Sequence, residues 1–428
     1  MRWFDGLAAV VLAGLASWLV TLPLPRDLEG TAYDLLLRAR HEIYGQIFTP
    51  RGGRPPASPV VVVALDEDTG LRPPFDRLPQ ELWTPQIAEV MRAALDAGAL
   101  FIAQQQAFVA SAESAVEGYD ANYLAVLREA AGSNRIVLGR RAPAPDRLGP
   151  APQHAEAVGG DRNVRHIALY PDRDGVLRHA ALYEALLDRT GANSLYPSLA
   201  LELAARVVGE RPHLRNDSDL LLGRYVVPGS QDNTMLLNFQ GGDGGIPVYS
   251  LGDLHACAAD GDAAFFRKHF DNKVVIFGRT DAPRWRRVTA ARFLGVRSAE
   301  RYAERCRLPL IQSLAARAAD SDRAGTLPEV LVSATAVRNL LMQEAVKSLP
   351  QIAVIGICAL LALAVTWAVL RIAPYLVGAA AILALGGWSY LAVVMLAREL
   401  WLMPLAQPAL AVAVSFAAAW IYRGIRRL

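Results

Sequence analysis

SLPQIAVIGICALLALAVTWAVL (348–370), IAPYLVGAAAILALGGWSYLAVVMLA (372–397) and LWLMPLAQPALAVAVSFAAAWIY (400–422) follow one another at the end of the chain. Each run is 23 to 26 residues long and contains no Asp, Glu, Lys or Arg. About 20 apolar residues in a helix cross the hydrocarbon core of a bilayer. Because only Arg371 and the Arg398–Glu399 pair separate the runs, we expect three transmembrane helices in one up-down-up unit. Three buried helices of a soluble core are the alternative, but charge-free runs of this length are typical of membrane spans.

A fourth charge-free run covers residues 6–25. A cleaved signal peptide also begins with a positive charge followed by an apolar stretch. This run is longer than the usual apolar core of a signal peptide, and TLPLP (21–25) offers no clear small-x-small cleavage site. We therefore expect residues 1–25 to form an uncleaved transmembrane anchor.

The positions of the arginines predict the orientation in the membrane, since cytoplasmic flanks are enriched in Lys and Arg. A cytoplasmic N-terminus leaves only Arg398, beside Glu399, in an outer loop and places five arginines inside: Arg2, Arg371, Arg423, Arg426 and Arg427. The sequence thus predicts a multi-pass protein of the bacterial inner membrane with four spans and both termini in the cytoplasm. Residues 26–347 would form a periplasmic domain, 348–422 a three-helix membrane unit and 423–428 a short basic tail.

The charge of the predicted periplasmic domain is nearly balanced. Six of the 44 Lys and Arg and two of the 41 Asp and Glu lie outside residues 26–347, which leaves 38 positive against 39 negative side chains. The chain's net charge of +3 therefore comes from the membrane flanks, which argues against a nucleic-acid partner. Cys257 and Cys306 could pair in an oxidising compartment or could remain two free buried thiols, while Cys358 lies in a predicted span.

The first half of the domain alternates strand and helix patterns. Apolar runs at 59–65, 99–108 and 135–139 are typical of strands covered on both faces. Helical patterns at 80–97 and 119–131 separate these runs. The alternation predicts an α/β domain with a mixed, mostly parallel sheet and helices on both faces.

The second half is less regular. We expect two strands around a turn within 166–186, a helix at 193–208 and antiparallel strands in RYVVP and TMLLNFQGG (within 224–242). A short helix at 251–259 and a buried strand at 273–278 follow. Residues 279–326 are expected to be irregular, and a helix at 329–345 leads into the membrane.

The order of these parts resembles the type 2 CHASE family of extracellular sensor domains. The resemblance covers nearly the whole chain and rests on the succession of YDLLLRAR (33–40), PVVVVALDEDTG (59–70), ALDAGALFIAQQQAF (94–108), YPDRDGVLRHAALY (170–183), KVVIFGRTD (273–281), VSATAVRNLL (332–341) and three spans. It implies a periplasmic α/β input domain that signals through its anchors to a nucleotide cyclase, a kinase or a cyclic-di-nucleotide enzyme. This chain departs from the pattern at Gln105, where relatives usually have an acid, and at Ser333–Ala334, where a His–Ala pair is usual.

Four polar residues are candidates for a ligand site. Asp66 follows the first buried strand, at the carboxyl end where open α/β sheets bind ligands. Gln105 ends the neighbouring strand, and Asn238 and Asp281 also follow apolar strands, so the four could meet in one crevice. The alternative for the acidic Asp66–Glu67–Asp68 stretch is a solvated loop or a helix cap.

An arginine-rich segment at 279–307 is the second candidate site. It holds nine Arg against Asp281, Glu300 and Glu304. Such a surplus could dock an acidic protein surface, anionic lipid head groups or an acidic ligand. It could equally be a solvated face paired with acids elsewhere. The predicted partner-binding residues are Arg279, Arg284, Trp285, Arg286, Arg287, Arg292 and Arg297.

Catalytic and metal motifs are not evident. Asp172 and Asp174 lack the further ligands of a calcium loop, so a hairpin turn is favoured there. His166 and His179 flank that turn without a third ligand nearby, which favours ordinary packing over zinc. We find no nucleophile elbow, phosphate loop or His–Glu metalloprotease pair. We therefore expect neither enzyme activity nor a cofactor.

These observations predict a non-catalytic sensor or regulatory subunit that signals through its membrane helices to a separate effector. A structural subunit of a membrane complex, which keeps the sensor fold without a ligand, is the alternative. The input half of a truncated adenylate cyclase or histidine kinase is a third interpretation, because only six residues follow the last predicted span. The expected partners are the lipid bilayer, a protein partner or a second copy, and a small-molecule ligand.

Overall fold

The computed structural model divides the 428-residue chain into two compact units. The membrane unit comprises residues 1–48 and 346–428, and the α/β domain comprises residues 49–345. The structure describes residues 2–426 except 20, 45–56, 106–107, 142–148, 168, 188–192, 216–218, 230–232, 241–244, 282, 295–299 and 313–324. Each unit is described by itself below.

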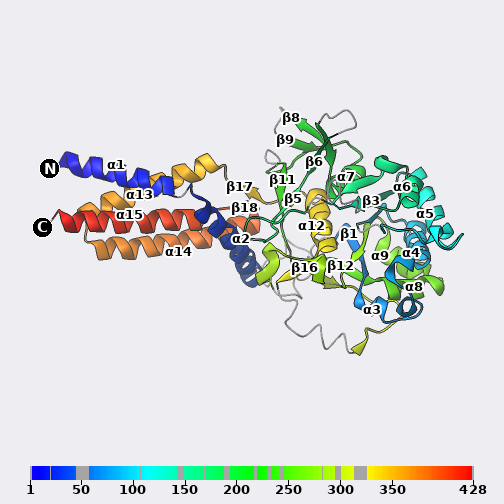
Figure 1. The fold of residues 1–428 in the computed structure, drawn as a ribbon. Coiled ribbons are helices and arrows are strands. Elements are labelled where there is room, and N and C mark those ends of the chain that lie inside the picture. The colour runs from blue at the N-terminus through cyan, green and yellow to red at the C-terminus, as the bar shows by residue number, and fades with distance from the viewer. Residues whose placement is uncertain are drawn as a thin grey trace. The chain divides into compact units, whose positions relative to one another are not determined.

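In its described residues the membrane unit has five helices and one short strand pair, with the helices drawn in Figure 1. The helices are α1 (Arg2–Leu19), α2 (Pro23–Tyr44), α13 (Gln351–Arg371), α14 (Pro374–Arg398) and α15 (Ala406–Ile425). Among the described residues, α13, α14 and α15 are long and apolar enough to cross a membrane, whereas the apolar part of α1 covers only Ala9–Leu19. The three C-terminal spans are confirmed, but the structure identifies three candidate spans where the sequence predicted four.

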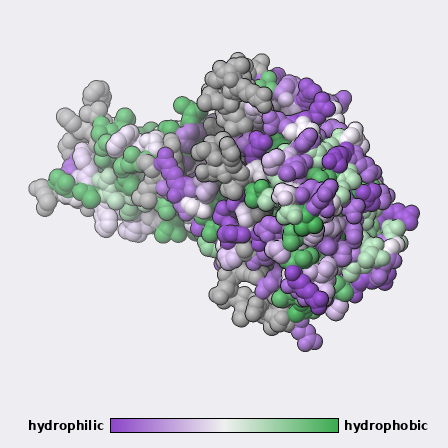
Figure 2. Space-filling view, turned by 45° about the vertical axis from the view of Figure 1, so that its right-hand side comes forward, coloured by the Kyte–Doolittle hydropathy of each residue, from purple (hydrophilic) through white to green (hydrophobic). Residues whose placement is uncertain are grey.

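Small residues line the contacts between the membrane helices. Ala13 and Ala16 of α1 pack against Ala362 of α13, which lets the backbones approach closely. Large apolar side chains point outward instead: Ile352, Leu383 and Ile382 are between 73% and 81% exposed. Figure 2 shows hydrophobic residues gathered over this unit, in contrast to the mostly hydrophilic surface of the α/β domain. An apolar exterior over a small-residue interior is the arrangement that lipid favours.

The helix α2 is tied to the start of α15. Both carboxylate oxygens of Glu29 accept hydrogen bonds, at 2.7 Å from the backbone nitrogen of Leu405 and 3.1 Å from that of Gln407. These donors have no partner inside α15, so the carboxylate caps the helix. Nearby, β17 (Lys347–Ser348) pairs with β18 (Trp401–Leu402), which joins the entrance of α13 to the loop before α15.

A parallel sheet of seven strands forms the centre of the α/β domain (Figure 1). The strand order is β15–β12–β1–β13–β2–β3–β4, and every pairing in it is parallel. The strands are β1 (Val60–Leu65), β2 (Phe101–Gln104), β3 (Ile136–Arg140), β4 (Val164–His166), β12 (Ile246–Ser250), β13 (Val274–Arg279) and β15 (Glu300–Tyr302). The predicted α/β fold with a parallel sheet is confirmed.

Helices cover both faces of this sheet. Side chains of Val61, Val63 and Leu65 join one core with α4 (Thr84–Asp96), α5 (Ala121–Gly132), α8 (Leu251–Ala259) and α9 (Ala263–Phe270). The opposite face packs against α7 (Leu199–Val208) and α12 (Glu329–Leu341). All six residues of β1 are buried, which explains its uninterrupted apolar sequence.

Short antiparallel pairs complete the domain. They are β5 (His179–Ala181) with β11 (Thr234–Leu236), β6 (Tyr183–Leu187) with β7 (Asn193–Pro197), β9 (Asp219–Leu222) with β8 (His213–Arg215) and β10 (Tyr225–Val226), and β14 (Arg286–Val288) with β16 (Thr326–Pro328). The connecting helical turns are α3 (Glu67–Gly70), α6 (Pro152–Ala157), η1 (Phe75–Arg77), η2 (Gln80–Leu82), η3 (Ala112–Ser114), η4 (Gly160–Arg162), η7 (Pro283–Trp285) and η8 (Ala290–Phe293).

Two local predictions were wrong. The strands on either side of the turn at 171–175 do not pair with each other, because β4 extends the parallel sheet beside β3 while β5 pairs with β11. The helix predicted from residue 193 begins at Leu199, and β7 precedes it. Pro197 disfavours helical backbone in the residue before it, and the Ser198 hydroxyl then caps α7 by accepting from the Leu201 amide.

Candidate functional site

A cavity of about 280 Å³ lies at the carboxyl ends of the central strands. Gln105 directly follows β2, Gly139 and Arg141 lie at the end of β3, and Gly278 and Arg279 end β13. The first residues of α12 and the η7 turn supply further walls, together with Glu81, Val109 and Ile167. This edge is where open α/β sheets bind their ligands. We call it the strand-end cavity.

Two glycines allow the walls of this cavity to approach one another. A Cβ atom at Gly278 would lie 2.6 Å from the Cβ of Val330, closer than packed atoms tolerate. A Cβ at Gly139 would collide with the backbone oxygen of Gln105. The glycines therefore bring α12 against β13, and the chain after β2 against β3.

Three guanidinium groups surround a single indole ring in the cavity wall. The Cζ atoms of Arg141, Arg284 and Arg279 lie 4.4, 5.2 and 5.7 Å from the centroid of Trp285. An aromatic face attracts cations at such distances. Three like charges around one ring also repel one another, so their carboxylate partners determine the charge of the site.

Two of the three arginines have acidic partners. Arg141 forms an ion pair with Glu329, which Arg287 also contacts at 2.6 Å. Arg279 bonds Asp281 through two nitrogens, at 2.9 and 3.1 Å. For Arg284, no carboxylate lies within ion-pair distance among the residues that the structure describes.

Two buried polar atoms of the cavity wall have no hydrogen-bond partner in the described part of the chain. They are Oε1 of Gln105, a residue only 3% exposed, and Nε1 of Trp285. A buried polar group without a partner costs roughly 1–3 kcal/mol. A bound molecule with polar atoms could remove this cost. The apolar side chains of Val109, Ile167 and Val330 line the rest of the cavity.

The four residues predicted to bind a ligand do not come together. Gln105 lines the cavity, and Asp281 is held beside it by Arg279. Asp66 instead caps α3, accepting from the Thr69 amide at 2.9 Å and from the Ser250 hydroxyl at 2.9 Å. Burial raises the pKa of Asp66, although these hydrogen bonds act in the opposite sense.

Asn238, the fourth of these residues, contacts α12 far along the helix from the cavity. Its backbone amide donates to Oδ1 of Asn339 at 2.8 Å, and its carbonyl accepts from Nδ2 of Asn339. Asn238 thus anchors the C-terminal half of α12.

The residues predicted to bind a partner divide into two groups. Arg279, Arg284 and Trp285 line the cavity. Two others hold the segment to the domain, since Arg286 donates to Thr326 and Arg287 pairs with Glu329. The Arg292 guanidinium lies 4.8 Å from the ring centroid of Phe293, within the same segment. Arg297 lies outside the described residues.

The sequence reasoning missed Arg141 and Glu329. Arg141 comes two residues after the strand predicted at 135–139, so the rule that selected Asp66 and Gln105 could have selected it. Glu329 gave no such signal, because an acid in the first turn of a helix is ordinary.

Asp172 and Asp174, which were considered as calcium ligands, form ion pairs with an arginine of the same domain. Arg178, itself 3% exposed, contacts Asp172 at 3.0 Å and Asp174 at 2.8 Å. Hydrogen bonding from Arg178 holds the pKa of Asp174 below its ordinary value. The two flanking histidines do not meet: His179 pairs with Asp172 at 3.0 Å and His166 with Glu184 at 2.9 Å.

A buried group of Ser111, Asp120 and His154 contains the residue types of a hydrolase triad. The Ser111 and Thr84 hydroxyls both donate to Asp120, and Nε2 of His154 lies 3.4 Å from the same carboxylate. Ser111 therefore bonds the acid and not the imidazole, so this arrangement lacks the contact between nucleophile and base. Burial lowers the pKa of His154 and keeps its ring neutral.

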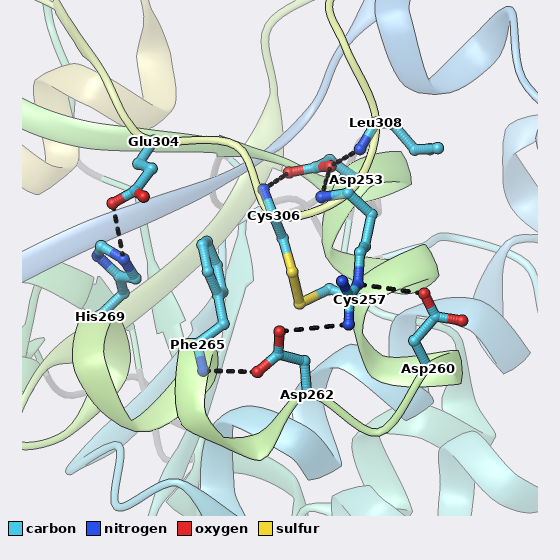
Figure 3. The surroundings of a disulfide bond; sticks show 10 residues. Asp253, Cys257, Asp260, Asp262, Phe265, His269, Glu304, Cys306 and Leu308 are labelled. Atoms are coloured by element: carbon cyan, nitrogen blue, oxygen red, sulfur yellow. Dashed lines mark hydrogen bonds and ion pairs between the residues drawn. A yellow bond between two sulfur atoms is a disulfide. The ribbon is translucent and has the colours of Figure 1, made fainter.

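Cys257 and Cys306 form a disulfide that ties α8 to the segment after β15 (Figure 3). Their sulfur atoms and a carboxylate oxygen of Asp262 lie within 4.8 Å of one another, a spacing that would suit a metal ion. Because the sulfurs are joined to each other, they are not thiolate ligands. Of the two alternatives left by the sequence, the structure has the disulfide.

Comparison with known proteins identifies the family. The model described as the CHASE2 domain matches residues 7–373, well over half of the chain. No curated protein and no solved structure gave a significant match. A sensor domain of this kind, together with three candidate membrane helices, fits a membrane sensor. The resemblance seen in the order of sequence motifs is confirmed, and the chain belongs to the CHASE2 domain family.

Proposed function

We propose that this chain is a non-catalytic sensor subunit of the bacterial inner membrane, which binds a small molecule in the strand-end cavity and signals to a separate effector. In this proposal the α/β domain lies in the periplasm and both termini lie in the cytoplasm. The positive-inside pattern of Arg2, Arg371 and Arg423 supports this orientation.

The observation that carries the proposal is where α12 begins and where it ends. Its first two residues, Glu329 and Val330, belong to the cavity wall. The helix ends at Leu341, and only the nine residues 342–350 separate it from α13, a candidate membrane span. A ligand that moves the start of α12 would therefore act on the chain segment that enters the membrane.

The contacts of α12 favour its behaviour as one rigid element. Every residue from Glu329 to Leu340 is buried. Near its end, Arg338, whose side chain is 4% exposed, bonds the partly buried Glu344 at 2.8 Å and Gln240 at 2.9 Å. Removing one partner of a buried pair is costly, so these contacts keep the helix intact up to its last turn.

We also propose that α1 is the fourth membrane helix. It packs along α13 and α15, and its buried residues Ala9, Ala13 and Ala16 recur at intervals of three and four on one face. Val10, Val11 and Leu15 on other faces are more than half exposed. An apolar helix with a small-residue seam on two spans is suited to the same bilayer.

Hydrogen exchange on the full chain in detergent micelles tests the sensor function. A defined library of amino acids, organic acids, sugars and nucleosides is first screened by thermal shift against the wild type and Gln105→Leu, which alters the cavity wall. We expect a compound that raises the Tm of the wild type but not of the variant, and that slows exchange in peptides covering α12 and residues 342–350.

Two results would contradict the proposal. One is stabilisation by every active compound that is the same in Gln105→Leu as in the wild type. The other is a ligand that binds the cavity without changing exchange beyond Leu341. Purification from native membranes is the matching test of the structural-subunit alternative, which requires a stable complex with other proteins regardless of Gln105.

A further inference from the structure

The charge of the strand-end cavity indicates the chemical class of its ligand. We propose that the cavity binds a small organic carboxylate, whose anionic group meets Arg284 and whose apolar body lies against Trp285 and Val330. This inference rests on the proposed sensor function, which names the site but leaves the ligand open.

The lining of the cavity holds one more positive than negative charge. Arg141, Arg279 and Arg284 face it, against Glu81 and Glu329. Two charged residues outside the lining contact these side chains: Arg287 pairs with Glu329, and Asp281 pairs with Arg279. Their opposite charges cancel, so the net charge of the site stays the same. Among the described residues one guanidinium is thus left without a counter-charge, and a singly charged anion would supply it.

Arg284 is the arginine with that free charge. Arg141 and Arg279 already have Glu329 and Asp281, whereas Arg284 has an exposed side chain and, within the described residues, no acidic partner. Its guanidinium is held 5.2 Å from the centroid of Trp285, over the cavity wall. A planar fork of N–H donors matches a carboxylate in two parallel hydrogen bonds.

The unpartnered polar atoms fit the same ligand. The buried Nε1–H of Trp285 is a donor without an acceptor among the described residues, and a carboxylate supplies one. The amide of Gln105 can turn to present its nitrogen, and it then becomes a second neutral donor.

The size and walls of the cavity call for an apolar body as well. Its volume of about 280 Å³ exceeds that of one inorganic ion, since a water molecule takes roughly 30 Å³ of liquid volume. Val109, Ile167, Val330 and the Trp285 ring make much of the surface apolar. A bare anion would leave those side chains in contact with water.

Four probes of graded charge test this inference on the full chain in detergent: benzoate, benzamide, benzamidine and inorganic phosphate. The first three share one shape and carry negative, neutral and positive charge. We expect benzoate to bind about tenfold or more tightly than benzamide, because a hydrogen bond to a charged group is markedly stronger than one between neutral groups. Benzamidine and phosphate should bind more weakly than benzoate.

Matched variants locate the binding. Arg284→Gln should weaken benzoate about tenfold and leave benzamide unchanged, since Arg284 is exposed and its replacement should not unfold the domain. Glu81→Gln should tighten benzoate by removing a like charge from the lining. Arg215→Gln, an exposed arginine of β8 outside the cavity lining, is the control and should change neither affinity.

Equal affinities for benzoate and benzamide, tighter binding of benzamidine or phosphate, or no benzoate binding would each overturn the carboxylate inference. So would benzoate binding that Arg284→Gln leaves intact. Failure of the sensor function has a different signature. In that case benzoate would bind with the expected charge preference, but hydrogen exchange at 342–350 would not change.

Discussion

Replacing Asp253 by Asn should destabilise the α/β domain far more than an ordinary surface change. Asp253 lies in the first turn of α8 and is 2% exposed. Its two carboxylate oxygens accept from the backbone amides of Cys306, Arg307 and Leu308 at 2.7, 2.9 and 2.6 Å (Figure 3). These bonds fix a chain segment that has no regular structure of its own.

The magnitude follows from what Asn retains. A hydrogen bond to a charged group contributes roughly 1.5–3 kcal/mol. Asn keeps one oxygen acceptor, but its amide nitrogen would face backbone N–H donors where the second oxygen accepted. Losing one to two of the three bonds, with incomplete additivity, should lower the unfolding free energy by about 3 kcal/mol.

Thermal unfolding of the full chain in detergent measures this effect. The α/β domain spans residues 49–345, which is 297 residues, so its unfolding entropy is about 0.6 kcal/mol/K and the Tm should fall by roughly 5 °C. Asp260→Asn is the control, because the Asp260 side chain is 59% exposed and pairs with that of Arg307 at 3.1 Å, its one ionic partner among the described residues. It should shift the Tm by no more than about 1 °C, since exposed pairs contribute little. Equal shifts for the two variants would refute the assignment of Asp253 as the anchor of this segment.

Two further predictions concern the same domain. Replacing both Cys257 and Cys306 by Ala should lower the unfolding free energy by about 4 kcal/mol and the Tm by roughly 6 °C, because the disulfide closes a loop with a sequence separation of 49. An unchanged Tm in non-reducing buffer would show that the bond does not form. Burial lowers the pKa of His154, so the histidine binds a proton more readily in the unfolded chain than in the folded one. The stability contributed by the neutral ring is therefore present above about pH 6.5 and is lost as the pH falls below that value. His154→Gln should therefore flatten the decline of Tm between about pH 6.5 and 5 relative to the wild type, and a parallel decline in both proteins would contradict this account.

The sequence predicts those parts of the fold that depend on local pattern. The all-apolar run at 60–65 could only be a strand covered on both faces, and the charge-free runs after residue 348 could only form long apolar helices. These signals need no knowledge of distant contacts. Errors arose where short strands pair at long range, as with β5 and β11, which are more than 50 residues apart along the chain.

For the candidate site, the sequence predicts individual residues but not which of them come together. The carboxyl ends of parallel strands share one edge, and this rule directed attention to Gln105, which lines the cavity. The same rule selected Asp66, but a carboxylate directly before a helix turn is used as its cap, as the Thr69 contact shows. Asn238 failed for another reason: it follows β11, which lies outside the main sheet, so the edge rule does not apply to it.

Two separate sequence predictions meet in one place in the structure. The polar residue Gln105 suggested a ligand site, and the arginines after β13 suggested a docking surface. Arg279, Arg284 and Trp285 turn out to be walls of the cavity that Gln105 also lines. Position 105 therefore influences the charge that these arginines present. An acid there would balance the three arginines of the lining, whereas the neutral amide leaves one positive charge over. In the proposed site the neutral amide of Gln105 therefore favours an anionic ligand, whereas an acid at this position would favour a neutral one.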